Sequence, residues 1–90
     1  MNSRTTRQFR ELFARLPAHV QQQAREAYRL FQSDPHHPGL HFKKVNDDPL
    51  TFSARVGISF RAVAALDRDT VVWFWIGSHT DYDKLLATMQ

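Results

Sequence analysis

The chain has 90 residues, which is the length of a single domain, expected here over residues 1–90. It has no cysteine, which excludes a disulfide framework and thiolate chemistry, and its longest apolar run, residues 71–76, is too short to span a membrane. Residues 1–45 carry eight basic and three acidic side chains, a net charge of +5, whereas residues 46–90 carry four and six, a net charge of −2. A basic half attracts polyanions such as RNA or DNA, although a solvated helix surface has the same composition. The polar, basic N-terminus lacks the apolar segment of a secretory signal, so we expect a soluble, cytoplasmic protein.

The first part of the chain predicts a hairpin of two helices. Apolar residues recur at helical spacing in two stretches that Pro17 separates. The first helix is expected to begin after a cap at Thr5 or Thr6, and the second to end before residues 34–35. Residues 2–5 could form a short edge strand before them. The two apolar stripes are Phe9, Leu12, Phe13 and Leu16 in the first helix and Val20, Ala24, Ala27, Tyr28 and Phe31 in the second.

Beyond the second helix the apolar period changes from that of a helix to that of a strand. A loop rich in Pro and Gly covers residues 34–42. Alternating apolar and polar residues then predict strands joined by tight turns, and the last strand is apolar on both faces, as a central strand is. The expected elements are a short strand through Leu40, Phe42 and Val45, a turn over 46–49, strands over 50–57, 60–66 and 70–77, and turns over 57–59 and 67–69.

The chain ends in a predicted helix with Tyr82, Leu85, Leu86 and Met89 on its apolar stripe. Thr80 is expected to cap it, with two aspartates in the first turn, where carboxylates suit the helix dipole. This element order predicts an α+β fold, in which an N-terminal helical hairpin packs on one face of a mainly antiparallel sheet and a short helix follows. Because the hairpin covers only one face, the other is left partly open, and we expect a site there.

Two arginines on the predicted strands are the first candidates for that site. Arg61 is the only charge in "ISFRAVAAL", and a guanidinium among apolar residues needs a partner. That partner is either structural, such as Asp67, Asp69 or a carbonyl, or a bound phosphate, which suits the planar fork of an arginine. Arg55 lies on the neighbouring strand across a short turn. The two arginines could hold one phosphate between them, which favours the second interpretation.

Lys43 and Lys44 lie near the start of the sheet, and only one of the two can face the interior side of the sheet, whereas the other faces water. They are either solvated surface residues or contacts to the backbone of a long anion.

His79 and Tyr82 lie where the last strand meets the last helix. A histidine there can give or take a proton near neutral pH, although a buried structural histidine has the same sequence signal. Tyr82 belongs to the apolar stripe, so its ring is expected to pack and its hydroxyl to emerge or to find a partner.

A zinc site at His36, His37 and His41 is not expected. The last two have the spacing of ligands on a helix, but residues 38–39 are Pro-Gly, which excludes a helix there.

Taken together, these segments show that the chain resembles the RelE/ParE superfamily of bacterial toxins. The resemblance runs from Phe9 to Leu86 and is most specific in "ARVG" closely followed by "FRAV" and in the ending "IGSH..YD..L". It implies the toxin of a type II toxin–antitoxin pair, with an antitoxin protein, the ribosome and mRNA as partners. DNA would be reached only through the toxin–antitoxin complex, and no membrane or cofactor is implied. The RelE-like branch cleaves mRNA in the ribosomal A site without a metal, by attack of a 2′-hydroxyl on the adjacent phosphate.

The resemblance also implies roles for the candidate residues. Arg61, His79 and Tyr82 match the catalytic positions: the strand arginine that grips the phosphate, the position after the last strand's glycine, and the C-terminal aromatic. The positions that match RNA contacts are Arg55, Lys43 and Lys44.

The chain departs from the RelE-like pattern at two points. Phe52 and Ala54 stand where many relatives carry lysines, and no glutamate base lies in the sheet. Two alternatives therefore stay open: a ParE-like inhibitor of DNA gyrase, which needs no catalytic set, and an inactive member that only binds an antitoxin. His79 together with Tyr82 favours the nuclease.

Overall fold

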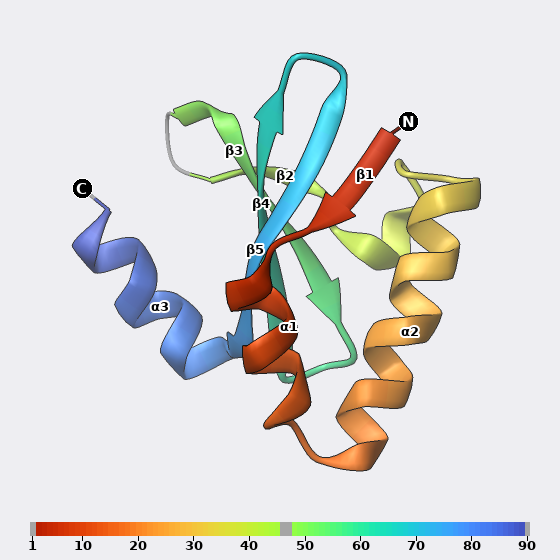
Figure 1. The fold of residues 1–90 in the computed structure, drawn as a ribbon, viewed down its shortest axis with the longest axis vertical. Coiled ribbons are helices and arrows are strands. Elements are labelled where there is room, and N and C mark those ends of the chain that lie inside the picture. The colour runs from red at the N-terminus through yellow and green to blue at the C-terminus, as the bar shows by residue number, and fades with distance from the viewer. Residues whose placement is uncertain (1, 46–47, 90) are drawn as a thin grey trace.

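The structure is a computed structural model that describes residues 2–45 and 48–89. Two helices follow a first short strand, and four strands then lead to a last helix (Figure 1). The elements are β1 (Asn2–Thr5), α1 (Arg7–Ala14), α2 (Ala18–Ser33), the 3₁₀ helix η1 (Pro38–Leu40), β2 (Lys43–Val45), β3 (Asp48–Val56), β4 (Phe60–Asp67), β5 (Thr70–Ser78) and α3 (His79–Thr88). None of these helices is long and apolar enough to cross a membrane.

The strands form one sheet in the order β1-β5-β4-β3-β2. β1 pairs with β5 in parallel, and the other neighbours pair antiparallel. The mainly antiparallel sheet, the edge strand at residues 2–5 and the central position of residues 71–76 are confirmed. The apolar run on β5 follows from this position, because a strand with neighbours on both sides and helices on both faces has no solvated side.

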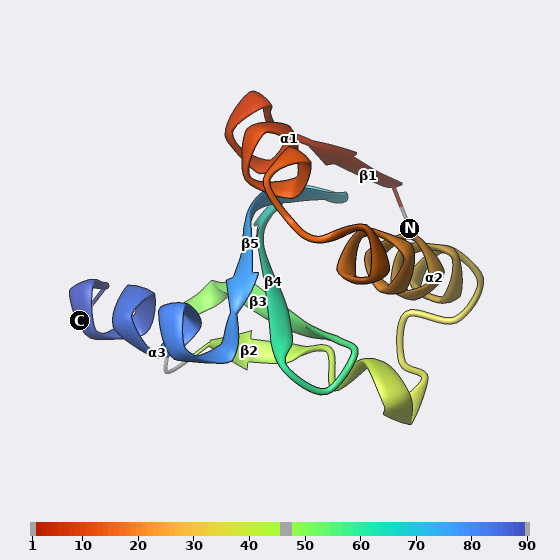
Figure 2. The same cartoon turned by 90° about the horizontal axis from the view of Figure 1, so that it is seen from below.

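The helices lie on both sides of the sheet. α1 and α2 form the predicted hairpin on one face, and α3 lies on the other face against β4 and β5 (Figure 2). The hydroxyl of Thr6 accepts a hydrogen bond from the backbone N–H of Phe9 at 3.1 Å and caps α1 as predicted. The core lies between the hairpin and the sheet and includes Phe31, Val56 and Trp73. The predicted α+β fold is confirmed, because the helical hairpin covers one face of a mainly antiparallel sheet and a short helix follows the last strand.

A β-bulge sends the two tryptophans of β5 to opposite faces. Val63 pairs with Trp75, but the next residue of β4, Ala64, pairs with Trp73, so Phe74 is the extra residue. In a regular strand, residues two apart share a face. The bulge breaks this rule, because a bulged strand gains one residue relative to its partner. Trp73 therefore packs into the core under the hairpin, and Trp75 lies on the side of α3.

The predicted short strand around Leu40 is displaced. Leu40 belongs to η1 and is 2% exposed, and strand β2 begins only at Lys43. Pro38 and Gly39 favour a tight turn over a strand, and the burial of Leu40 holds that turn in the core.

The turn expected over 46–49 is also different. Residues 46 and 47 lie outside the described residues, and Asp48 already begins β3. The pKa of Asp48 is lowered because the backbone N–H of Leu50 and the hydroxyl of Thr51 donate to its carboxylate.

Candidate functional site

The two candidate arginines lie directly opposite each other on the sheet. Arg55 of β3 and Arg61 of β4 are partners in the antiparallel register. Their sequence neighbours Ala54 and Ala62 belong to the core under the helical hairpin, so the arginines face the other side. Like charges at directly opposed positions of a sheet repel each other. The sequence and the short 57–59 turn thus place two cations side by side on the face that α1 and α2 leave uncovered.

Within the described residues, backbone carbonyls rather than carboxylates accept from these arginines. Arg55 Nε donates to the carbonyl of Gly57 at 2.9 Å, and Arg61 Nη1 donates to the carbonyl of Phe60 at 3.1 Å. The ion pairs of the described chain, Arg7–Glu11 and His79–Asp83, include neither arginine. Arg61 therefore has a structural partner of one kind that the sequence analysis named, a backbone carbonyl. This bond does not exclude a bound phosphate. It uses one of the five donors of a guanidinium and leaves the positive charge uncompensated.

A histidine that the sequence analysis considered only for a zinc site, which it did not expect, lies beside the arginine pair. His41 Nε2 lies 3.5 Å from Arg55 Nη1, and the His41 ring is exposed. The register explains this contact. Lys43 pairs with Ser53, so His41, two residues earlier, comes opposite Arg55, two residues later. The register shift between Lys44 and Val45 aligns the two residues, because the pairing of Val45 with Asp48, continued without the shift, would place His41 opposite Phe52. The sequence does not reveal this shift, so the contact could not be predicted from it. No three metal-ligating side chains come together in the part of the chain that the structure describes.

The junction of β5 and α3 differs from the predicted cap. β5 continues to Ser78, and its hydroxyl accepts from the N–H of Asp81 at 3.1 Å, so Ser78 is the N-cap instead of Thr80. The chain is extended at Ser78, as an N-cap requires, and the N–H of His79 donates to the carbonyl of Ser59 at 2.8 Å. The start of α3 is thereby tied to the turn between the two arginine strands. Of the two aspartates predicted in the first turn, only Asp81 lies there.

His79 is the first residue of α3 instead of the residue before its cap. Its Nδ1 lies 3.3 Å from Asp83 Oδ2, one turn further along the helix, and its side chain is 50% exposed. An exposed imidazole is open to a substrate, which a buried structural histidine would not be. The described residues show no hydrogen bond between the ring of His79 and either arginine. His79 is therefore near the pair through its backbone, on the β5 side, while His41 lies on the β2 side.

Tyr82 packs as its place on the apolar stripe predicted. It is 9% exposed, with its ring centroid 6.4 Å from that of Trp75 and 6.0 Å from that of His79. Trp75 lies against Gly77, because a Cβ at Gly77 would stand 2.7 Å from the indole. Gly77 is in turn the register partner of Arg61. The sequence analysis missed Trp75 as a neighbour of the arginine face, since only the bulge places it there.

Replacing Gly77 with alanine is expected to push the Trp75 indole off β5 and to lower the free energy of unfolding by about 1–3 kcal/mol, the usual effect of overpacking. Denaturant unfolding measures the loss, and the near-ultraviolet circular dichroism of the tryptophans reports the displacement. In a Trp75→Leu background the clash disappears, so the same replacement should cost less there. An equal loss in both backgrounds would contradict the contact as its cause.

The two lysines point to different faces, as expected for neighbours on a strand. Lys43 pairs with Ser53 and shares the face of Arg55, whereas Lys44 pairs with Phe52 on the face of the hairpin. Both are exposed. The structure thus brings Lys43 onto the arginine face and directs Lys44 to the other face.

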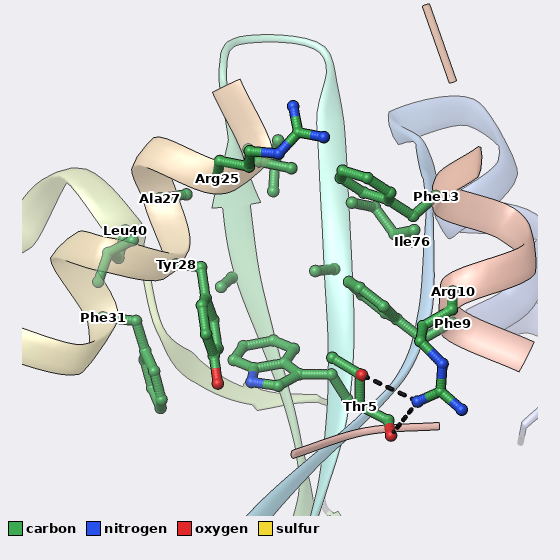
Figure 3. A pocket seen from close by; sticks show the side chains of 15 residues that line it. Thr5, Phe9, Arg10, Phe13, Arg25, Ala27, Tyr28, Phe31, Leu40 and Ile76 are labelled. Atoms are coloured by element: carbon green, nitrogen blue, oxygen red, sulfur yellow. Dashed lines mark hydrogen bonds between the residues drawn. The ribbon is translucent and has the colours of Figure 1, made fainter. Parts of the chain in front are cut away.

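The helix side of the sheet holds a cavity of a different kind. It has a volume of about 180 Å³ and lies between α1, α2 and the sheet, where the rings of Phe9, Phe13, Tyr28 and Phe31 line it (Figure 3). Figure 3 also shows Arg10 turned aside to Thr5, whose carbonyl accepts from it at 2.8 Å. Its lining is mostly apolar, and the hydroxyl of Tyr28 is hydrogen-bonded to that of Ser3. The chemistry of this molecule is therefore to be sought on the arginine face.

The fold and the paired arginines define a small basic α+β domain with a cationic sheet face, and the comparisons with known proteins identify its family. The chain belongs to the ParE-like toxin domain family, whose model matches residues 18–84. No curated protein sequence matches the chain significantly.

Solved structures have the same fold. The RelB–RelE antitoxin–toxin complex from Methanococcus jannaschii is similar with a TM-score of 0.72 and 15% identity, covering 90% of this chain and 95% of that one. The toxin–antitoxin complex RelBE2 from Mycobacterium tuberculosis has a TM-score of 0.68 and 24% identity, with 87% and 96% covered. The isolated RelE toxin from E. coli has a TM-score of 0.66 and 12% identity, with 99% and 98% covered. The fold is thus RelE-like, and the chain is a toxin of the RelE/ParE type.

Proposed function

We propose that this toxin is a ribosome-dependent endoribonuclease that cleaves mRNA without a metal. Arg61 and Arg55 grip the phosphate to be cleaved, and His79 transfers a proton. Tyr82 orients the site through its ring, because it is buried against Trp75 and contacts His79. Lys43 extends the cationic face along the RNA backbone. Lys44 is also proposed to contact RNA, although it lies on the opposite face and so outside the phosphate site itself.

The observation that carries this proposal is the opposition of Arg55 and Arg61 in the register. Two guanidiniums at directly opposed positions repel, and the carbonyls that accept from them do not neutralise their charge. A phosphate between them removes the repulsion, and each planar fork can donate two parallel hydrogen bonds to its oxygens.

The reaction class follows from what such a pair stabilises. When a ribose 2′-hydroxyl attacks the adjacent phosphorus, negative charge develops on the phosphoryl oxygens, and two fixed cations stabilise that charge more than the ground state. The 2′-oxygen loses its proton and bonds to phosphorus, while the bond to the 5′-oxygen breaks and that oxygen gains a proton. The products are a 2′,3′-cyclic phosphate and a 5′-hydroxyl, and no metal is needed.

The proposal is tested by adding the protein to translating ribosomes and mapping the ends of the mRNA. We expect cuts in phase with the codons and cyclic phosphate at the new 3′ ends, and no cuts with an Arg55→Ala/Arg61→Ala double variant. Intact mRNA with the wild-type protein would refute the nuclease.

A second candidate function is inhibition of DNA gyrase, and the observation that favours it is the match to the ParE-like family. A parallel assay of gyrase supercoiling separates the two. Gyrase inhibition with intact mRNA would support this alternative, and silence in both assays would support an inactive member that only binds an antitoxin.

An antitoxin protein is the proposed partner in either case. Two of the similar structures described above are toxin–antitoxin complexes. We propose that the protein acts in the cytoplasm, where ribosomes and gyrase are found.

A further inference from the structure

We infer that His41 is a second proton-transfer residue of the proposed nuclease, acting as the base toward the 2′-hydroxyl. This inference rests on the proposed function. The reaction moves two protons, one from the 2′-oxygen and one to the 5′-oxygen, and these atoms lie on opposite sides of the phosphorus. Among the residues that the sequence analysis assigned to the catalytic site, His79 is the one proposed to transfer a proton, and a single residue cannot lie on both sides of the phosphorus at once. His79 lies on the β5 side of the arginine pair, and His41 lies on the β2 side.

The loop before β2 is built to hold His41 in a fixed place. His37 accepts from the N–H of Gly39 through Nδ1 at 3.0 Å and, through its carbonyl, from the N–H of Leu40 at 3.0 Å. The N–H of His41 donates to the carbonyl of Pro38 at 3.2 Å, and Leu40 is anchored in the core. Each backbone step from residue 37 to residue 41 is therefore fixed by a hydrogen bond or by burial. The side chain that emerges from this anchored turn is the exposed ring of His41.

The backbone of His41 has an uncommon conformation. Its φ is 47° and its ψ is 41°, in the left-handed region that non-glycine residues seldom occupy. Such conformations persist where the surrounding structure imposes them, and they gather at functional sites. The other non-glycine residue with a positive φ in the described chain, Arg68, lies in the tight β4–β5 turn, which explains it. His41 ends a 3₁₀ turn where glycine would serve as well, so its imidazole needs a separate explanation.

The contact with Arg55 fixes which nitrogen of His41 is available as a base. A guanidinium can only donate, so the 3.5 Å contact between Arg55 Nη1 and His41 Nε2 requires a lone pair on Nε2. The charged groups of the sheet on this face are Arg55, Arg61 and Lys43. The helix α3, which packs on the same side, adds His79, Asp81, Asp83 and Lys84. When a phosphate binds, Arg55 turns to it and leaves the Nε2 lone pair facing the ribose.

The step is then balanced. His41 Nε2 accepts the proton of the 2′-hydroxyl, and the 2′-oxygen bonds to phosphorus. The P–O5′ bond breaks with its electron pair on the 5′-oxygen, which takes a proton from protonated His79. One proton enters at His41 and one leaves from His79, and solvent restores both residues afterwards.

The test uses His41→Asn and His41→Gly in the ribosome assay. Both residues accept the left-handed backbone, so both variants should keep the thermal unfolding temperature of the wild type. Loss of a base is expected to slow cleavage about 10²–10⁴-fold and to remove the fall in rate on the acid side of the pH profile. Added imidazole should partly restore cleavage by His41→Gly, because the ring site is open to solvent. A merely structural histidine would show neither effect.

The outcomes separate the two proposals. If wild-type protein leaves mRNA intact, the nuclease and the role of His41 both fall. If the wild type cleaves and His41→Asn cleaves at the same rate with the same pH profile, only the inference about His41 is overturned. A slow His41→Gly variant that imidazole does not accelerate and whose pH profile is unchanged would also overturn it, because it would assign the ring to positioning Arg55.

Discussion

Replacing Arg61 with alanine is expected to weaken binding of a single-stranded RNA about 10- to 150-fold. A hydrogen bond to a charged group contributes roughly 1.5–3 kcal/mol, and Arg61 is proposed to make such bonds to the phosphate. Arg61→Lys keeps the charge but loses the planar fork, so it should recover only part of the affinity. Fluorescence anisotropy with a labelled oligonucleotide, read at one fixed salt concentration, measures the change.

The matched control for Arg61 is Arg29→Ala. Arg29 is exposed on α2, on the far side of the sheet from the arginine pair, and its replacement removes the same charge. We expect less than a twofold effect from it. Equal weakening by both variants would mean that net charge alone attracts the RNA. If Arg61→Ala lowers the unfolding temperature strongly while the folded fraction binds RNA normally, the bond to the Phe60 carbonyl is the whole role of Arg61.

His79→Ala is expected to slow mRNA cleavage about 10²–10⁴-fold while binding to the ribosome stays nearly intact, which is the usual effect of removing a general acid or base. Tyr82→Phe keeps the ring against Trp75 and should cost less. Tyr82→Ala should cost more than Tyr82→Phe, partly through stability, because Tyr82 is buried. Single-turnover cleavage on programmed ribosomes separates the rate of the reaction from binding.

The control for His79 is Asp83→Asn, which removes the charge that faces Nδ1 and keeps the shape of the side chain. If the role of His79 is only to pair with Asp83, the two variants should have equal effects. Full cleavage by His79→Ala together with loss in Tyr82→Phe would contradict the assignment, because the phenol would then be the proton carrier.

The fold was largely predictable from local patterns. The apolar stripes at helical spacing gave the hairpin, and the alternation along residues 50–57 gave a strand with two different faces. Alternation also placed Arg55 and Arg61 on one face, since short turns leave little freedom in the register of a hairpin. The apolar run at residues 71–76 indicated a central strand, because a strand that is buried on both faces carries apolar residues on both.

The details of the site were less predictable, because they depend on contacts between distant segments. Thr80 was expected to cap α3, but the bond from the N–H of His79 to Ser59 keeps the chain extended to Ser78, which becomes the cap. Both hydroxyl residues can cap a helix, and nothing local chooses between them. The bulge at Phe74 likewise arises from pairing with β4, and without it Trp75 would lie in the core beside Trp73.

The sequence by itself determined the helical hairpin, the strands with their faces, the two arginines on the face opposite that hairpin, and the resemblance to a toxin family. These features follow from periodicity and short turns, which act between neighbours in the chain. Only the tertiary structure decided that His41 comes to Arg55, because the burial of Leu40 and the register of β2 with β3 fix that approach. The position of a loop residue depends on the long-range contacts of its neighbours, and these contacts cannot be derived from a single sequence.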